Sequence, residues 1–400
     1  MTGARKLGPV EFIALMAATM AVVAFAIDST LPAFPTIIAE MTPDAPNHVQ
    51  LLITTFMLGI GIGTLVVGPL SDAYGRKPVL IGCAVLYSTG ALLAWQAPSL
   101  EPMLAARLVQ GLGAAGARVV TVALVRDLYK GREMARVVSF IMMVFTIVPA
   151  MAPMIGSVII GAFGWRALFL AYVLMSAITC LWLVIRQEET LPPVQRRPLR
   201  IGTLISGMAE IMRNRVVMMT IIAQGFAFGC MFSTISSIQQ IFTVRFDAEA
   251  TFTYWFFAIA VVAGFSSLLN AALVVKVGMR ILVTSVLTAE FLISLSMAVL
   301  NGFDLLPEGV AFAAQILWTM SMFGMLGLCM GNLNALALEP LGHLAGLGAS
   351  VSGCIATIMA VVLSLPVGQS FDGTNIPLAI GMTVYTGIAL TIMLALPKRH

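Results

Sequence analysis

The sequence predicts an all-α membrane protein in which twelve transmembrane helices form two six-helix bundles. Three observations predict this fold: the composition, the long apolar segments, and a charged turn that recurs near half-length. Of the 400 residues, 60% are hydrophobic and 10% are charged, and the mean hydropathy is +1.00. A soluble domain is about 45–50% apolar and about 25% charged. An apolar surplus of this size requires lipid as the main solvent.

A helix that spans a bilayer needs roughly 20 mostly apolar residues, and we count twelve such segments. They cover approximately 10–33, 48–70, 78–97, 101–124, 135–161, 165–186, 216–241, 251–275, 281–301, 309–337, 344–368 and 374–396. None has the short alternating pattern of a β-barrel strand. The first segment lacks a cleavage pattern, so we expect a retained span and not a cleaved signal.

The basic residues predict that both termini are cytoplasmic. With the N-terminus inside, 18 of the 22 Lys and Arg residues fall on the cytoplasmic side of the predicted spans. Such an excess follows the positive-inside rule. The even number of spans returns the C-terminus to the same side, where it carries its own basic residues.

The longest connection divides six predicted spans from six. We therefore expect an N-terminal bundle at 1–186, a cytoplasmic linker at 187–215 with a short interfacial helix near 204–212, and a C-terminal bundle at 216–400. No other loop is long enough for a folded soluble domain, and the sequence has no Walker-type glycine loop. These features disfavour a nucleotide-driven pump, a receptor kinase or an enzyme built outside the membrane.

Cysteine and histidine usage excludes further classes. The five cysteines all fall within apolar segments, and the three histidines lie outside them or, as His48 does, at the edge of one, so we expect no disulfide framework, no metal site and no cofactor. The net charge of +4 comes from basic residues in short loops, which is not the footprint of a nucleic-acid partner. The expected partners are the lipid bilayer, protons and a small molecule, with the protein acting as a monomer.

The charged turn lies between the second and third apolar segments. Glycine permits a sharp turn there, and Asp72 can pair with Arg76 and Lys77 at the start of the next helix. A weaker copy follows 203 residues later, with Gly278 corresponding to Gly75 and Arg280 to Lys77. A turn repeated at half-length indicates two similar halves, the internal symmetry of many transporters.

Several motifs resemble those of one family. The turn resembles the loop 2–3 signature of the major facilitator superfamily, with Ala73 in place of the usual arginine; it matches at Gly68, Leu70, Asp72, Gly75, Arg76 and Lys77. Arg107–Gly113 resembles the span 4 motif. Pro149–Gly156 is similar to the span 5 antiporter motif, with Ala152 replacing a glycine. Ile27–Pro35, Arg126–Tyr129 and Glu189–Pro193 are similar to the Bcr/CflA group of bacterial drug exporters.

The resemblance implies a transporter and not an enzyme. It implies drug/proton antiport by alternating access across the bacterial inner membrane, with a central cavity formed mainly by spans 1, 4, 7 and 10. It further implies conformational roles for the turn and for the span 5 motif. The predicted gating residues are Gly68, Asp72, Gly75, Arg76, Lys77, Pro149, Pro153 and Gly156.

Two charged residues in the first half are candidates for proton coupling. Charges inside a span are costly, and Asp28 on span 1 and Arg107 on span 4 are expected at similar depth. Asp28 would carry the proton, and movement of Arg107 would control its binding. The alternative interpretation is a permanent structural pair near the membrane interface.

The predicted substrate-binding residues lie on both halves. On span 4, residues 107, 110, 111, 114 and 118 share one helical face. Arg118 either faces a ligand or extends toward the cytoplasmic headgroups. The amides of the second half either bind a polar drug or join helices. The full set is Asp28, Arg107, Gln110, Arg118, Gln224, Phe228, Gln239, Trp318 and Asn332.

Glu290, near the middle of span 9, has two possible roles: a protonated side chain hydrogen-bonded to a neighbouring helix, or a second proton site.

Three functions are compatible with these residues. The first is a proton-coupled exporter of small amphipathic drugs. The second is a transporter of a small organic anion or metabolite, because two buried arginines outnumber the one nearby acid. The third, a polytopic sensor or intramembrane enzyme, lacks an output domain and any nucleophile–base or metal-ligand spacing. Drug-dependent proton flux in liposomes separates these hypotheses.

Overall fold

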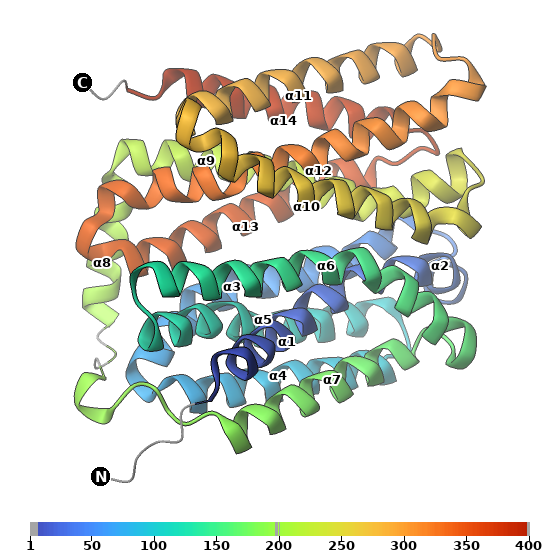
Figure 1. The fold of residues 1–400 in the computed structure, drawn as a ribbon. Coiled ribbons are helices and arrows are strands. Elements are labelled where there is room, and N and C mark those ends of the chain that lie inside the picture. The colour runs from blue at the N-terminus through green and yellow to red at the C-terminus, as the bar shows by residue number, and fades with distance from the viewer. Residues whose placement is uncertain (1–6, 197–198, 200, 398–400) are drawn as a thin grey trace. The chain divides into compact units, whose positions relative to one another are not determined.

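A computed structural model describes residues 7–196, 199 and 201–397. Within this part of the chain the regular elements are helices and no strand occurs. Among these residues, eleven helices are long and apolar enough to cross a membrane, and a shorter apolar stretch, Ile147–Phe163, belongs to a further helix. The predicted all-α, multi-pass membrane fold is therefore confirmed (Figure 1).

The chain divides into two compact units. The first unit comprises Met1–Pro43 and Thr55–Ile201, and the second comprises Asp44–Thr54 and Gly202–His400. The boundary after residue 201 falls within the linker expected at 187–215. Helix α3 (Leu51–Tyr74) contributes to both units, because its first turn belongs to the second unit and its remainder to the first.

The first unit is built from long apolar helices, in which every span satisfies its own backbone hydrogen bonds. Besides the larger part of α3, its helices are α1 (Pro9–Asp28), α2 (Phe34–Met41), α4 (Arg76–Gln96), α5 (Leu100–Leu128), α6 (Gly131–Phe163) and α7 (Ala167–Arg186). Helix α1 packs against α5, α6 and α7, and α4 packs against α5 and α7. The buried core includes Phe12, Leu15, Met16, Leu124 and Ile141.

The second unit repeats this pattern of neighbours. Its helices are α8 (Ile201–Arg213), α9 (Arg215–Gln240), α10 (Phe252–Val277), α11 (Met279–Gly302), α12 (Glu308–Leu338), α13 (Ala345–Gln369) and α14 (Ile376–Ala395). Helix α9 packs against α12, α13 and α14, and α11 packs against α12 and α14. The α8 helix covers the short helix predicted near 204–212. Asn214 then caps α9 by accepting hydrogen bonds from the backbone N–H groups of Val216 and Val217.

The turn and its copy have the same backbone conformation. Gly75 lies between α3 and α4 with φ of 107°, and Gly278 lies between α10 and α11 with φ of 88°. Positive φ angles of this kind are readily adopted only by glycine. The predicted correspondence between the two glycines is therefore confirmed.

The two cations that follow these glycines also have equivalent partners. Lys77 Nζ donates to the carbonyl oxygen of Val184, near the end of α7, at 2.8 Å. Arg280 donates to the carbonyl oxygen of Pro397 at 2.8 Å and to that of Leu396, just beyond α14. A cation at the carbonyl end of a helix is favoured by the helix dipole. Each cation thus anchors the last long helix of its unit.

Candidate functional site

Asp28 is the last residue of α1, and only 4% of it is exposed. The hydroxyls of Ser29 and Thr30 donate hydrogen bonds to the backbone carbonyl oxygens of Phe25 and Ala26, one turn earlier in α1. Both hydroxyls also form hydrogen bonds with the Tyr172 hydroxyl on α7, at 2.8 Å and 2.9 Å. Helix α7 therefore fixes the end of α1 that carries Asp28.

Arg107, on α5, is completely buried in the first unit. Its guanidinium donates to the carbonyl oxygen of Ala26 at 3.1 Å and to Gln110 Oε1 at 2.8 Å. It also lies over the ring of Phe56, 4.2 Å from the centroid, where a cation–π interaction is favourable. Ala26 lies in the same turn of α1 as Asp28, so the cation is held against that turn. Direct pairing of the Asp28 and Arg107 charges stays a prediction.

Gly156, on α6, approaches the same end of α1. A Cβ atom at this position would lie 2.5 Å from the carbonyl oxygen of Ser29, so only glycine allows the two helices to come this close. Pro149 and Pro153 lie inside α6, which continues beyond them to Phe163. The end of α1 that carries Asp28 is thus contacted by α5, α6 and α7, all within the first unit.

The residues on the predicted face of α5 differ in their exposure. Gln110, Gly111 and Ala114 are buried like Arg107, whereas the side chain of Arg118 is exposed. At about 1.5 Å rise per residue, Arg118 lies about 16 Å along the helix from Arg107. The structure therefore brings Gln110 to Arg107 and leaves Arg118 apart from this buried group.

The predicted polar residues of the second unit form contacts within that unit. Gln224 Oε1 accepts a hydrogen bond from Ser352 on α13 at 3.1 Å. Asn332 Nδ2 donates to Asn270 Oδ1 on α10 at 2.7 Å. Gln239 is buried and donates to Thr243 Oγ1, four residues later, at 3.0 Å. Two of the three amides therefore join helices in this structure.

The two predicted aromatic residues of the second unit differ in exposure. Phe228 is half-buried and lies against Phe232 on the same helix, with ring centroids 6.1 Å apart. Trp318 is only 1% exposed and belongs to the core of the unit. Its indole donates to Ser294 Oγ on α11.

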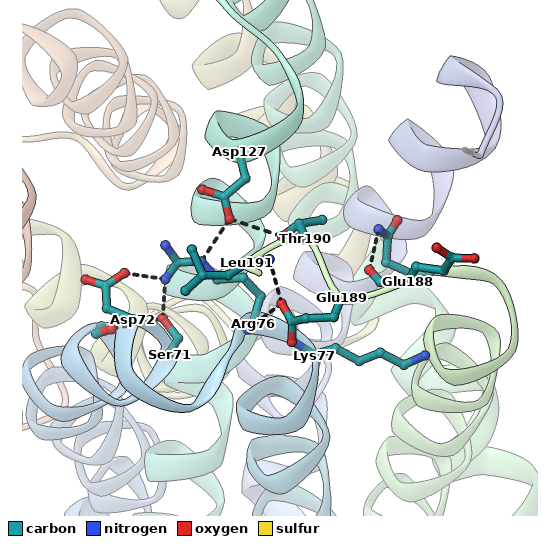
Figure 2. A network of polar contacts seen from close by, with 11 residues as sticks. Ser71, Asp72, Arg76, Lys77, Asp127, Glu188, Glu189, Thr190 and Leu191 are labelled. Atoms are coloured by element: carbon teal, nitrogen blue, oxygen red, sulfur yellow. Dashed lines mark hydrogen bonds and ion pairs between the residues drawn. The ribbon is translucent and has the colours of Figure 1, made fainter. Parts of the chain in front are cut away.

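The predicted gating turn forms a dense polar network with two other segments (Figure 2). Arg76 is 3% exposed and forms ion pairs with Asp72 at 2.5 Å and with Asp127, at the end of α5, at 3.0 Å. It also donates to Ser71 Oγ at 2.7 Å. The predicted pairing of Asp72 with Arg76 is confirmed, whereas the Lys77 side chain donates to the α7 carbonyl described above. Gly68, on the preceding turn of α3, accepts a hydrogen bond from Ser71 Oγ at 2.9 Å.

Residues that follow α7 complete this network. Glu189 accepts hydrogen bonds from the backbone N–H groups of Arg76 and Lys77 at 3.0 Å and 3.1 Å, so it satisfies donors at the start of α4. Thr190 Oγ1 donates to Asp127 Oδ2 at 3.1 Å. Three motifs that are far apart in the sequence thus meet at one end of the first unit (Figure 2).

An amide cluster in the second unit joins the segment before α3 to α9 and α13. Its members are Asn47, Gln50, Gln240 and Gln369. Gln50 Nε2 donates to Gln240 Oε1 and, at 3.1 Å, to a carbonyl oxygen near the end of α13. Gln240 Nε2 donates to the carbonyl oxygen of Pro46 at 3.2 Å, and Gln369 Nε2 donates to that of Asn47 at 3.0 Å. These neutral groups explain why residues 44–54 belong to the second unit.

The first unit also contains a small cavity of about 30 Å³ between α1, α4, α5 and α7. Its lining includes Thr19, Tyr87, Ser176 and Cys180, and it includes none of the predicted site residues. This volume accepts one or two water molecules, which excludes a drug-sized ligand from this cavity.

Comparison with known proteins defines the family. The sequence matches the family model of the Major Facilitator Superfamily over residues 16–365. The chain belongs to the major facilitator superfamily. A bicyclomycin resistance protein homolog from Haemophilus influenzae is 27% identical over 381 residues, covering 94% of this chain and 93% of that protein.

Two further members of the superfamily resemble this chain. Multidrug resistance protein MdtL from Citrobacter koseri is 33% identical over 167 residues, covering 42% of each chain. The partially occluded inward-open structure of the xylose transporter XylE from E. coli aligns with a TM-score of 0.71 at 13% identity, covering 96% of both chains. At this identity the XylE structure supports the superfamily fold alone.

Several residues at these sites were missed by sequence reasoning. Phe56 contacts Arg107 and Tyr172 bonds to the end of α1, but in the sequence both are ordinary aromatic residues of apolar spans. Asn47 and Gln50 lie in a short polar segment that has the composition of any loop. Asp127 and Glu189 lie in the motifs at 126–129 and 189–193, so these motifs could have indicated that the two residues matter.

Proposed function

We propose that this member of the superfamily is a proton-coupled multidrug exporter, which moves small amphipathic drugs out of a bacterial cytoplasm by alternating access. The observation that carries the proposal is Asp28, a buried carboxyl at the end of an apolar helix, with Arg107 bonded to the same turn through Ala26. Inside a span, an ionisable side chain is a functional candidate by default. The names of the two resistance-protein relatives support drugs as the substrates.

In the proposed cycle, Asp28 binds a proton when it faces the outside and releases it when it faces the cytoplasm. An apolar environment favours the neutral acid, and a nearby guanidinium favours the carboxylate. A small displacement between α1 and α5 would change the distance from Arg107 to Asp28 and so shift this balance. The hydrogen bonds of Tyr172 to the end of α1 support a role for α7 in positioning the acid.

The two bundles, 1–186 and 216–400, would move about the predicted substrate-binding residues, with 187–215 as the cytoplasmic linker between them. The polar network around Arg76 supports a conformational role for the gating turn, since it holds the turn, the end of α5 and the linker together. We further propose that the protein acts as a monomer in the inner membrane with both termini in the cytoplasm.

The test is drug-dependent proton flux in liposomes that contain the purified protein. With bicyclomycin or another amphipathic drug, wild-type protein should release lumenal protons, and Asp28→Asn should reduce the flux to that of empty liposomes. The variant should still bind drug and keep its melting temperature, because asparagine resembles the protonated acid. Wild-type flux in the Asn variant refutes the assignment of Asp28.

A second candidate is transport of a small organic anion. It is favoured by Arg107 and Arg118 on α5, of which Arg107 is buried and Arg118 is exposed. Vesicle uptake of a small organic anion, compared with that of a neutral or cationic drug, distinguishes the two functions. Uptake of the anion that is lost in both Arg107→Gln and Arg118→Gln would support the second candidate.

A further inference from the structure

Glu290 is a buried carboxyl that the proposed transport cycle does not use. It lies near the middle of α11 and is 2% exposed, within the second unit. Helix α11 packs mainly against α12 and α14. Charged side chains inside an apolar bundle are rare unless they are paired or neutralised.

The partners of Glu290 form an ordered chain of donors between α12 and α11. Trp318 Nε1 donates to Ser294 Oγ at 3.1 Å, and Ser294 Oγ donates to Glu290 Oε1 at 3.3 Å. An indole N–H can only donate, so the Ser294 oxygen is the acceptor and its own proton is directed to the carboxyl. Glu290 Oε1 is therefore an acceptor in this arrangement.

A second hydroxyl, Ser321 Oγ on α12, also interacts with the carboxyl. It donates a hydrogen bond to the backbone carbonyl of Trp318 at 2.7 Å. The polar groups that reach Glu290 from α11 and α12 are therefore neutral hydroxyls, which leave the charge of a carboxylate without a counter-charge.

The charges around Glu290 give a carboxylate no compensation. The ion pairs Arg76–Asp72, Arg76–Asp127, Arg166–Glu40 and Arg186–Glu11 belong to the first unit and do not involve Glu290. The titratable neighbours of Glu290 are the thiols of Cys230 on α9 and Cys329 on α12. On α14, the hydroxyl of Tyr385 donates to the carbonyl oxygen of Leu363.

The cations on the adjacent elements lie at the ends of their helices. Arg280 begins α11 about 15 Å from Glu290 and is bonded to the end of α14. Lys276 is in the last turn of α10. No cation is therefore placed to stabilise an ionised Glu290 among the residues that the structure describes.

We propose that Glu290 is a proton-binding site of the second unit, held as the neutral acid and joining α11 to α12 through Ser294 and Trp318. At alkaline pH its O–H bond breaks, the electron pair stays on the carboxylate oxygen, and the proton passes to hydroxide. The resulting anion is buried without a counter-charge and weakens the contact between the two helices. This site is separate from Asp28 and does not depend on drug export.

Infrared spectroscopy of the purified protein tests the protonation state directly. At pH 7, Asp28→Asn should retain a protonated-carboxyl C=O band, and the double variant Asp28→Asn/Glu290→Gln should lose it. Ser294→Ala removes the donor to that C=O and should shift the band to higher frequency. A band that is unchanged by Glu290→Gln, or its absence from Asp28→Asn, would overturn the proposal.

Thermal unfolding supplies a second readout. Glutamine has the size of the acid and keeps both a donor and an acceptor, so Glu290→Gln should melt near the wild-type temperature at pH 7. Between pH 7 and pH 10 the wild-type melting temperature should fall further than that of the variant. An equal fall in the melting temperatures of both proteins would contradict a proton-dependent contact between α11 and α12. Should Glu290→Gln fail to fold, the frequency shift in Ser294→Ala decides the question.

Discussion

The guanidinium of Arg76 lies 3.0 Å from the carboxylate of Asp127, although 51 residues separate the two in the chain. This contact joins the start of α4 to the end of α5. Thr190 donates to the same oxygen of Asp127, so the segment after α7 is tied to the same point. One carboxylate thus holds three parts of the first unit together.

Replacement of Asp127 by alanine should destabilise the first unit more than replacement of Asp72. The Asp127 side chain is 16% exposed and that of Asp72 is 42% exposed, so water screens the second pair more. A hydrogen bond to a charged group contributes about 1.5–3 kcal/mol, whereas an exposed ion pair contributes about 0–1 kcal/mol. Thermal unfolding in the same detergent compares the two variants. A larger loss of stability in Asp72→Ala than in Asp127→Ala would show that Asp127 is not the main partner of Arg76.

Glu189→Ala should destabilise the start of α4, because Glu189 accepts hydrogen bonds from two backbone N–H groups there. Loss of a helix cap costs about 0.5–2 kcal/mol. The adjacent Glu188 is exposed and makes a matched control, and Figure 2 shows its side chain directed away from the network. Glu188→Ala should change stability by less than about 0.5 kcal/mol. Chemical unfolding curves measure both, and equal midpoints would rule out the capping role.

Local features of the fold could be predicted from the sequence. Long apolar segments identify spans because lipid requires them, and the i,i+4 spacing of Asp72 and Arg76 is enough to predict their pairing. The equivalence of Gly75 and Gly278 follows from their position between two apolar runs. Each of these features depends on residues that are close in sequence.

Contacts between distant segments could not be predicted in the same way. Arg76 meets Asp127 and Glu189 because α4 packs against α5 and α7, and no periodicity within one helix shows which neighbour it has. For the same reason, the contacts of Tyr172 and Gly156 with the end of α1 could not be predicted from the sequence. The roles of the site residues in proton coupling and drug binding stay predictions.

Gln240→Ala should loosen the segment before α3. Gln240 shares hydrogen bonds with Gln50 and with the carbonyl oxygen of Pro46, whereas Gln239 donates within its own helix to Thr243. Each lost hydrogen bond weakens the contact by about 0.5–1.5 kcal/mol, so the two together should speed local opening roughly 5-fold to 150-fold. Hydrogen–deuterium exchange of residues 44–54, followed by mass spectrometry, measures this opening. Gln239→Ala is the control, and an equal increase in that variant would contradict the amide cluster.

Gly156→Ala should impair pH-driven export more than Gly161→Ala. Both glycines lie on α6, but a Cβ atom at 156 would meet the Ser29 carbonyl at 2.5 Å, whereas nothing lies within 4 Å of one at 161. To relieve this clash, α6 or the end of α1 must shift, and Asp28 is the residue before Ser29. A displacement of about 1 Å at a reacting group can reduce its rate about 100-fold, so we expect a loss of tenfold or more in drug-dependent proton flux. Gly161→Ala should keep the wild-type flux, since alanine is favoured in a helix by about 1 kcal/mol and has open space there. Equal flux from both variants would show that the close approach of α6 does not position Asp28, and would leave Gly156 as a site of helix packing alone.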